Sequence, residues 1–435
     1  MDQIVIVALV MLISIIILLN MGAPISVSIG LGSFLAMMFI FPFDNATQTA
    51  SSKIFNGINS FSLLAIPFFI LAGNIMNSGG IAARLVNSSR LISGRMPGAL
   101  LQTNVVANTM FGALSGSGVA AAAAIGGTMG PLQQKEGYDK TLSTAVNIVS
   151  APTGMLIPPS NTLIVYATVA GSVSVSALFI AGYIPGLLWS LSVMIIAGII
   201  AKKKGYVTTD KYTFKEKMKI TFDALPSLLL IVIVIGGILK GVFTATEASA
   251  IAVMYSLLLS FAYRSLTIKE LPAIIIASTK MTAIVIFMIG MSTIMAFLLA
   301  YTHIPAFIAS LLLGLTDSFF VILLIMNVIL LIIGTFMDPT PAVLIFTPIF
   351  LPICLQFGMD PVQFGIMIVF NLSIGTITPP VGPILFTGCK VGNTKIEEVI
   401  KPMLPFYAAI FIVLLLVTYI PAISMWLPQL LGLVS

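Results

Sequence analysis

Long apolar runs without charged residues, separated by short polar turns, dominate the pattern of this chain. About 20 apolar residues in a helix are enough to cross the hydrocarbon core of a bilayer. Ten runs reach or approach that length, and each predicts a transmembrane helix. They cover residues 4–19, 24–42, 61–78, 141–171, 176–201, 225–243, 246–263, 272–300, 363–390 and 403–423. The pattern therefore predicts an all-α polytopic membrane protein with about ten crossings.

Two further apolar stretches are too long for one crossing, and polar residues interrupt each near its middle. Residues 98–132 contain SGSG at Ser115–Gly118, and residues 318–355 contain DPTP at Asp338–Pro341. Non-helical backbone is tolerated at membrane depth only where protein or water satisfies it. We therefore expect two re-entrant hairpins, each of which enters and leaves the membrane on the same side.

Composition and charge agree with this topology. The chain is 59% hydrophobic and 8% charged, whereas soluble domains carry about 25% charged residues. With the N-terminus outside, 17 of the 20 Lys and Arg residues fall in inner segments, as the positive-inside bias requires. They are Arg84, Arg90, Arg95, Lys135, Lys140, Lys202, Lys203, Lys204, Lys211, Lys215, Lys217, Lys219, Arg264, Lys269, Lys390, Lys395 and Lys401. Both termini are therefore predicted on the outer side.

The two halves of the chain resemble each other at an offset of roughly 220 residues. Asn104 precedes Ser115 by the same eleven positions that separate Asn327 from Asp338, and a double proline follows in each half. An odd number of crossings in each half turns the second half upside down, and inverted repeats with interrupted helices are typical of secondary transporters.

The predicted domains follow from this repeat. The first repeat is 1–205, with scaffold helices in 1–80, the hairpin 98–132 and the broken crossing 141–171. The second repeat is 225–435, with the hairpin 318–355 and the broken crossing 363–390. The basic segment 206–224 between them is predicted to be a cytoplasmic arm that lies on the lipid surface and contacts anionic headgroups.

The broken crossings predict ion sites. An interrupted helix offers carbonyl oxygens to a cation, and the next half-helix offers N–H groups to an anion. We expect each hairpin tip to meet the broken crossing of its own repeat and to bind one cation. The first site is predicted from backbone carbonyls of Gly112, Ser115, Ser117, Gly154, Ile157 and Pro159. The second is predicted from carbonyls of Gly334, Gly375, Thr378 and Val381, with hydroxyls of Thr335 and Thr378. These oxygens suit Na⁺, and H⁺ coupling stays open as an alternative.

Other residues near the breaks are candidates for binding or capping. Asp338 is the one acid in a hairpin tip, so it is either a functional carboxylate or the cap of a helix that starts at Pro339. An anionic substrate is expected near the half-helix N-termini. The candidates for that contact are Ser115, Gly116, Ser160, Asn161 and Thr340, where Ser160 or Asn161 can also cap the second half-helix.

Enzyme functions find no support in the motifs. The sequence has no Walker A loop, HExxH or CxxC motif, so it predicts neither ATP use nor an organic cofactor, and Na⁺ is the only expected ion. Its net charge of +6 comes from loops beside membrane helices and does not indicate nucleic acid. Two alternatives to a partner-dependent transporter stay open: a stand-alone Na⁺ symporter for divalent anions, and a channel or non-transporting scaffold.

Four motifs also carry a family resemblance. FGALSGSGVAAAAAIGGTMGP, APTGMLIPPSN, GTFMDPTPAVLIFTPIFLPI and TITPPVGPILF resemble the large membrane subunit, the M or DctM-like subunit, of tripartite ATP-independent periplasmic transporters. The resemblance implies a fold like that of the ion transporter superfamily. It also implies an elevator, in which both hairpins and both broken helices slide together against a stator formed by the remaining crossings.

The same resemblance implies partners and a cargo. It implies Na⁺-coupled uptake across the bacterial inner membrane, a separate small four-helix subunit (Q-type) and a periplasmic substrate-binding protein (P-type). The expected cargo is a small organic acid, either sialic acid or a C4-dicarboxylate. We give the sugar acid a slight preference, although no residue of the sequence decides between them.

Overall fold

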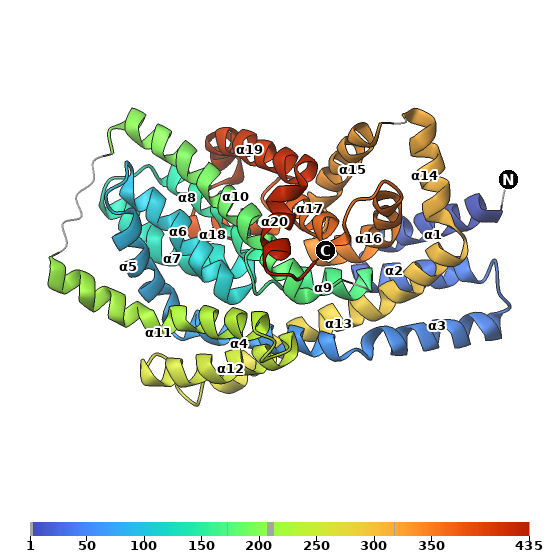
Figure 1. The fold of residues 1–435 in the computed structure, drawn as a ribbon, viewed down its shortest axis with the longest axis horizontal. Coiled ribbons are helices and arrows are strands. Elements are labelled where there is room, and N and C mark those ends of the chain that lie inside the picture. The colour runs from blue at the N-terminus through green and yellow to red at the C-terminus, as the bar shows by residue number, and fades with distance from the viewer. Residues whose placement is uncertain (1–2, 172, 207–212, 317, 435) are drawn as a thin grey trace.

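The computed structural model describes residues 3–171, 173–206, 213–316 and 318–434, which form helices and turns without a strand. Figure 1 shows an elongated molecule with the N-terminal helices at one end and the C-terminus near the middle. Among the described residues, seven helices are long and apolar enough to cross a membrane. They are Phe61–Ser78, Val175–Lys204, Phe214–Leu239, Ala245–Ala262, Leu271–Tyr301, Pro339–Gln356 and Ile396–Tyr419. The predicted all-α polytopic fold is confirmed.

Six of these seven helices coincide with predicted crossings. The seventh, α16 (Pro339–Gln356), is an arm of a predicted hairpin. Helix α1 (Gln3–Asn20) covers the first predicted run, and α2 (Ile25–Met37) is shorter than the second. The two remaining crossings are interrupted, as their prolines predict.

Three helices lie outside every predicted span, and a fourth begins at the very end of one. They are α3 (Phe43–Ile58), α5 (Ile81–Ser93), α14 (Ile304–Leu315) and, starting within the run 403–423, α20 (Pro421–Leu430). The first two are amphipathic and rich in polar residues, and the last two are only 12 and 10 residues long. A search for runs of crossing length passes over such helices, because their apolar residues recur on one face or end after a few turns.

The predicted connecting arm is helical in its second half. Residues 207–212 lie outside the described residues, and α11 (Phe214–Leu239) begins shortly after them. Thr213 starts this helix with a capping box, in which its backbone N–H donates to Glu216 Oε2 at 2.7 Å. Residues 214–224 are therefore continuous with α11, and their position on the lipid surface stays a prediction.

Each predicted hairpin is a pair of helices joined at the predicted interruption. In the first, α6 (Ala99–Ser115) ends at Gly116, whose φ of +63° suits glycine, and α7 (Gly118–Lys135) follows. In the second, α15 (Phe319–Gly334) is followed by α16. The second helices of the hairpins begin at equivalent caps, Ser117 and Asp338, each with extended backbone. This equivalence corrects the predicted match of Ser115 to Asp338 by two residues.

Both broken crossings consist of two short helices around a double proline. The first contains α8 (Lys140–Ser150), the 3₁₀ helix η2 (Ala151–Met155) and α9 (Asn161–Ala170). The second contains α17 (Pro361–Gly375) and α18 (Pro383–Gly392). The Pro158–Pro159 and Pro379–Pro380 bonds are both cis.

Helices α10 (Val175–Lys204) and α19 (Ile396–Tyr419) pack with the hairpins and breaks. A Cβ on Gly182 of α10 would lie 2.1 Å from the carbonyl oxygen of Leu156, so this close contact requires glycine. In α19, the Tyr407 hydroxyl donates to the carbonyl of Ile377 at the second break. These contacts place α10 and α19 beside the hairpins and breaks, and their predicted assignment to the stator stays a prediction.

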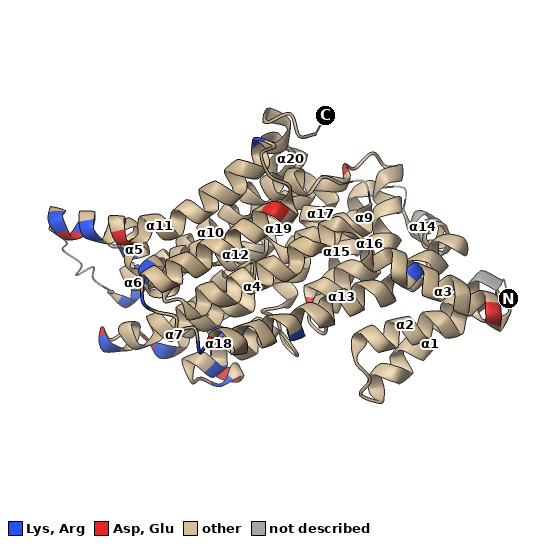
Figure 2. Cartoon of the chain, turned by 90° about the horizontal axis from the view of Figure 1, so that it is seen from below, with Lys and Arg blue, Asp and Glu red and all other residues tan. Residues whose placement is uncertain are grey.

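The other helices form a second group. Helices α1, α2 and α3 share a separate apolar core with the C-terminal half of α13 (Leu271–Tyr301). Helix α4 (Ala65–Ser78), which follows the short 3₁₀ helix η1 (Phe61–Leu64), packs on α12 (Ala245–Ala262) and on α13. Figure 2 shows most Lys and Arg residues at one end of the molecule, around the ends of α5, α7, α11 and α18.

Candidate functional site

The first hairpin meets the first break through two glycines. A Cβ on Gly112 of α6 would lie 2.3 Å from the Gly154 Cα, and a Cβ on Gly154 would lie 2.3 Å from the Gly112 Cα. At the tip, a Cβ on Gly116 would lie 2.7 Å from the carbonyl oxygen of Pro159. Only residues without side chains allow backbones to approach this closely. The structure therefore brings together both segments of the predicted first cation site.

The second hairpin meets the second break in the same manner. A Cβ on Gly375 would lie 2.3 Å from the carbonyl carbon of Gly334, whereas a Cβ on Gly334 would lie 3.3 Å from the Gly375 Cα. A direct backbone bond joins the segments, since the N–H of Val381 donates to the carbonyl of Thr335 at 3.2 Å. Val381 thus contacts the hairpin through its N–H group, and its predicted carbonyl contact with a cation stays a prediction.

The residues of the two junctions differ in burial. Ser115, Gly154, Ile157 and Pro159 of the first set are buried, whereas Thr335 and Thr378 of the second are partly exposed and Val381 is exposed. Side-chain hydroxyls take part in local bonds in both sets: Ser117 caps α7, Thr335 Oγ1 donates to Ile332 at 2.7 Å, and Thr378 Oγ1 donates to Ile374 at 2.8 Å. Each donating hydroxyl keeps lone pairs that can face a cation.

A cavity of about 190 Å³ lies between the two hairpin tips and the two breaks. Its lining comes from both tips, both broken crossings, α4 and α13, which are segments far apart in the sequence. The polar residues that line it are Ser117, Asn161, Thr162, Asp338, Thr340 and Thr376. This junction of all four interrupted segments is the candidate substrate site.

Helix dipoles make the cavity attractive to an anion although no described Lys or Arg lines it. Helices α7, α9 and α16 all begin at its wall, and α18 begins nearby, with Ile384 in the lining. Helix N-termini present N–H groups and partial positive charge. The amide of Asn161 also faces this region, and its Oδ1 is buried without a hydrogen-bond partner.

Asp338 adds a carboxyl group to the same wall. It occupies the N-cap position of α16, and its residue surface is exposed. Its carboxylate lies close to the N–H and hydroxyl of Thr340, without a side-chain bond of proper cap geometry. A carboxylate beside a bound anion is unfavourable unless a cation lies between them. The site thus has a physical reason to bind a cation together with an anion.

The predicted substrate residues separate into two groups. Gly116, Asn161 and Thr340 line the cavity, but Ser115 and Ser160 do not. The Ser160 hydroxyl donates to the Met155 carbonyl at 2.5 Å and accepts from the Leu163 N–H at 3.4 Å. Ser160 is therefore the cap of α9, as predicted, and both of its bonds lie within the break.

Several supporting residues were missed from the sequence. Asn108 Nδ2 lies 2.8 Å from Ser150 Oγ and 3.1 Å from Asn147 Oδ1, and so links the first hairpin to α8. In the second half, Asn371 Nδ2 donates to Asn327 Oδ1 at 2.7 Å. Buried amides in otherwise apolar helices were the available signal, because such groups require partners in a membrane.

The chain matches one family model over residues 12–423: "Tripartite ATP-independent periplasmic transporter, DctM component". It is 50% identical to the uncharacterized protein YgiK of Salmonella typhimurium, with 95% of each chain covered. It is 40% identical to the isethionate TRAP transporter permease protein DctMQ of Oleidesulfovibrio alaskensis, covering 94% of this chain and 64% of that protein. The C4-dicarboxylate TRAP transporter large permease protein DctM of Rhodobacter capsulatus is 37% identical, with 94% and 96% covered.

A solved structure has a similar fold. The YdaH transporter of Alcanivorax borkumensis, described as having an unusual topology, matches with a TM-score of 0.64 at 14% sequence identity. The match covers 88% of this chain and 89% of that one. At this identity, the similarity concerns the fold alone.

Proposed function

The chain belongs to the DctM component family of tripartite ATP-independent periplasmic transporters, and from that premise we propose that it performs Na⁺-coupled uptake of a small organic acid. Members of this family are transporter permeases and not enzymes. One observation carries the proposal: both hairpin tips and both broken crossings line a single cavity. In such a site, one bound ligand can influence the closure of both halves.

The proposed cargo is a small acid rather than a sugar acid. The named relatives transport isethionate, a two-carbon sulfonate, and C4-dicarboxylates. An apolar cavity of about 150 Å³ holds one benzene molecule. A space of about 190 Å³ suits a sulfonate or dicarboxylate of similar size, and these are the cargoes that we propose to test first. A relative named for sialic acid is 36% identical, so the sugar acid is the second candidate.

Na⁺ is proposed to bind at both glycine junctions. Backbone and hydroxyl oxygens gather there, and they are the ligands that hard cations without geometric demands accept. A cation at the second junction would lie on the same hairpin as Asp338 and would reduce its repulsion of an anionic cargo. This electrostatic link is the proposed origin of coupling between ion and substrate.

Movement is proposed to follow the packing. The hairpins, the broken crossings, α10 and α19 would move as one body against α1–α4, α12 and α13. The end of α10 is tied to this body, because Lys204 Nζ lies 2.7 Å from Asp139 Oδ2 at the start of α8. The basic end in Figure 2 would face the cytoplasm of a bacterial inner membrane, with both termini in the periplasm.

The proposed partners are a small four-helix membrane subunit and a periplasmic binding protein. The relative DctMQ supports the first, since this chain covers only 64% of its length. The rival function is a stand-alone divalent-anion:Na⁺ symporter. Reconstitution in proteoliposomes with an inward Na⁺ gradient separates the two. We expect uptake of a C4-dicarboxylate or isethionate only when both partners are present, and uptake by this chain alone would support the rival.

A further inference from the structure

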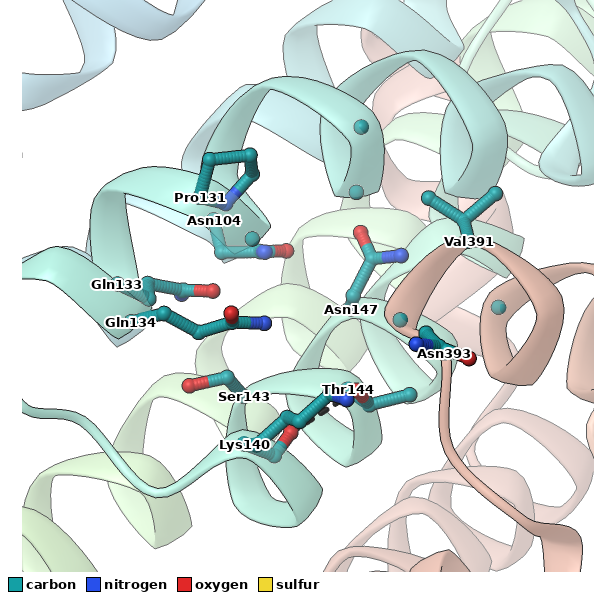
Figure 3. A pocket seen from close by; sticks show the side chains of 15 residues that line it. Asn104, Pro131, Gln133, Gln134, Lys140, Ser143, Thr144, Asn147, Val391 and Asn393 are labelled. Atoms are coloured by element: carbon teal, nitrogen blue, oxygen red, sulfur yellow. Dashed lines mark hydrogen bonds between the residues drawn. The ribbon is translucent and has the colours of Figure 1, made fainter.

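A second cavity, of about 170 Å³, lies between the first half and α18 of the second, away from the hairpin tips. Figure 3 shows its walls, which come from α6, the last turns of α7, the first turns of α8 and the end of α18. Eight of the fifteen lining residues carry polar side chains, among them Asn104, Gln134, Lys140, Ser143, Thr144 and Asn393. Nothing in the proposed transport cycle accounts for this cavity.

Asn104 presents an unused donor here. Its side chain is 0% exposed, and its Oδ1 accepts from Asn108 Nδ2 at 2.9 Å. The Asn108 Nδ2 also lies 3.3 Å from the Asn147 carbonyl, which can only accept, so the Asn108 amide is fixed and its partner in Asn104 is the oxygen. The opposite atom, Nδ2, is buried without a partner in the described structure. A buried donor left unpaired costs about 1–3 kcal/mol, so it signals a missing partner.

Ser143 and Lys140 add donors to the same wall. Ser143 is 4% exposed, and its Oγ also lacks a hydrogen-bond partner in the described structure. Lys140 is the first residue of α8, so its ammonium lies at the positive end of that helix. No Asp or Glu of the described residues lines the cavity, and the neighbouring Asp139 is paired with Lys204. An excess of donors and one cationic group is the chemistry that binds an oxyanion.

Two buried amides of the second half use their donors within the protein. Asn327 of α15 donates through Nδ2 to the Leu323 carbonyl at 3.0 Å and lies 3.2 Å from Thr418 Oγ1. Gln363 Nε2 donates to the Thr418 carbonyl at 3.1 Å. The Asn104 donor differs from these two, because no described group accepts from it.

The cavity lies across a contact between the two repeats. A Cβ on Gly392 of α18 would lie 2.3 Å from Thr144 Oγ1, and a Cβ on Gly388 would lie 2.2 Å from Ile148 Cγ1. The wall is thus tightly packed where α18 touches α8. In contrast, a Cβ on Gly130 would meet no atom within 4 Å, so that wall is open.

We propose that this cavity binds a small oxyanion of carboxylate or phosphate type between α7, α8 and α18, at a site separate from the transport cavity. Lys140 supplies charge, and Asn104 and Ser143 supply hydrogen bonds. A bound oxyanion would hold α18 of the second repeat against α8 of the first.

Inorganic phosphate serves as the probe. The full chain, in nanodiscs of zwitterionic lipid, is titrated with phosphate against chloride at constant Na⁺ and ionic strength, and the Tm is followed. We expect a saturable rise of a few degrees, because a ligand that binds only the folded state stabilises it. Lys140→Gln and Ser143→Ala should raise the half-saturating phosphate concentration at least about fivefold, on the scale of one lost charged or neutral hydrogen bond.

Three variants make the result decisive. Gly130→Leu should fill the open wall without a clash and abolish the rise, and Lys135→Gln, outside the lining, should leave it unchanged. Asn161→Ala, in the transport cavity, should also leave it unchanged. No saturable rise, or a rise that survives Gly130→Leu, would overturn the proposal in favour of a cavity filled by water only. A rise lost in Asn161→Ala would likewise overturn it.

A lipid headgroup could supply the same oxyanion, and a second arm identifies that source. Nanodiscs with phosphatidylglycerol should then raise the Tm in a manner that depends on Lys140 and should remove the response to free phosphate. Either source supports an oxyanion site. A Tm that responds to neither phosphate nor phosphatidylglycerol contradicts it.

Discussion

The two halves of the molecule share one backbone plan but complete it with different chemistry. Residues 221 positions apart cap corresponding helices. Ser117 and Asp338 are the N-caps of the second hairpin helices, and Asp139 and Asp360 are the N-caps of the broken crossings. The first junction is buried and capped by a neutral serine. At the second junction Val381 is 45% exposed, and the hairpin carries a carboxylate. The repeat therefore determines the backbone geometry of both junctions, while the residues that differ between the halves determine solvent exposure and charge.

The packing against each break differs as well. In the first half, Gly182 and Gly186 of α10 allow close contact with Leu156 and Ile157. In the second half, the Tyr407 hydroxyl of α19 satisfies the Ile377 carbonyl. The glycine contacts hold two backbones in close steric contact, whereas the Tyr407 hydrogen bond can break and re-form without a steric clash. We infer that the first junction is rigid and that the second is the adjustable one.

The largest expected effect is on the glycine contacts. Gly112→Ala, at the hairpin position that corresponds to Gly334, places a methyl group 2.3 Å from the Gly154 Cα, which cannot move aside, so we expect a loss of about 3 kcal/mol or failure to fold. Gly334→Ala has 3.3 Å of space and should cost less than about 1 kcal/mol, since alanine also favours the helix. Thermal unfolding measures both, with Gly236→Ala, which meets no atom within 4 Å, as the control. Equal losses at the two junctions would contradict the difference.

Removal of the Tyr407 hydroxyl should have the next largest effect. Tyr407→Phe leaves a buried carbonyl unpaired, which costs about 1–3 kcal/mol, and should loosen the second break only. Tyr419→Phe is the matched control, because its hydroxyl also donates to a carbonyl, that of Phe320, but at an exposed position where water can replace it. Hydrogen exchange of 375–385 against 151–161 is the readout. Increased hydrogen exchange at both breaks would show that Tyr407 does not stabilise the second break alone.

Asp338→Ser converts the second hairpin cap to the residue type of the first. A serine can still cap α16, so folding should be retained, while the apparent Na⁺ affinity for uptake should fall about tenfold through loss of one charge near the ion. Ser117→Ala, which removes the first cap, should instead lower stability by about 1 kcal/mol. Unchanged Na⁺ dependence in Asp338→Ser would assign Asp338 to capping alone.

Thr378→Ala tests the hydroxyl at the second junction. Its loss should raise the Na⁺ concentration for half-maximal uptake severalfold, because one ligand is removed and the backbone remains. Thr387→Ala is the matched control, since its hydroxyl makes the same bond to the carbonyl four residues earlier but lies outside the break. Equal Na⁺ curves for the two variants would remove Thr378 from the site.

The smallest effect concerns the caps of the broken crossings. Burial raises the pKa of Asp139, but hydrogen bonds from Lys204, Thr141 and the Leu142 N–H outweigh it and hold that pKa well below its ordinary value of 3.8. The stabilisation is therefore fully present above 3.8 and is lost progressively as the pH falls below it. At this partly exposed site, Asp139→Asn should lower the free energy of unfolding by about 1 kcal/mol at neutral pH. The difference in unfolding free energy between this variant and the wild type should decrease as the pH falls.

Asp360→Asn provides the comparison for the Asp139–Lys204 pair, because Asp360 is the corresponding cap of the second half. Asp360 caps α17 through the Val362 N–H at 2.7 Å, and the described residues give it no lysine partner comparable to Lys204. Its replacement should therefore cost less at neutral pH than that of Asp139. Urea unfolding between pH 3 and pH 7 measures both, and identical profiles would show that Lys204 contributes nothing.

Local chemistry explains how much the sequence could predict. Proline pairs, polar tips and glycine spacing predicted both hairpins, both breaks and their pairing, because these residues stop helices wherever they occur. The positions of α10 and α19 were not predictable in this way, since Gly182 and Tyr407 acquire their meaning only from contacts with a distant break. Ser160 was predicted both as a cap and as a substrate contact, and only its two bonds within the break separate these roles.

Direct binding of ²²Na⁺ to the purified full chain tests the duplicated cation site most directly. The account predicts two bound ions per chain, reduced to one in Thr378→Ala combined with Asp338→Ser, with the remaining ion exchanging slowly from the buried first junction. A single ion in the wild type, or loss of both ions in that double variant, would contradict two separate sites built on one repeated plan.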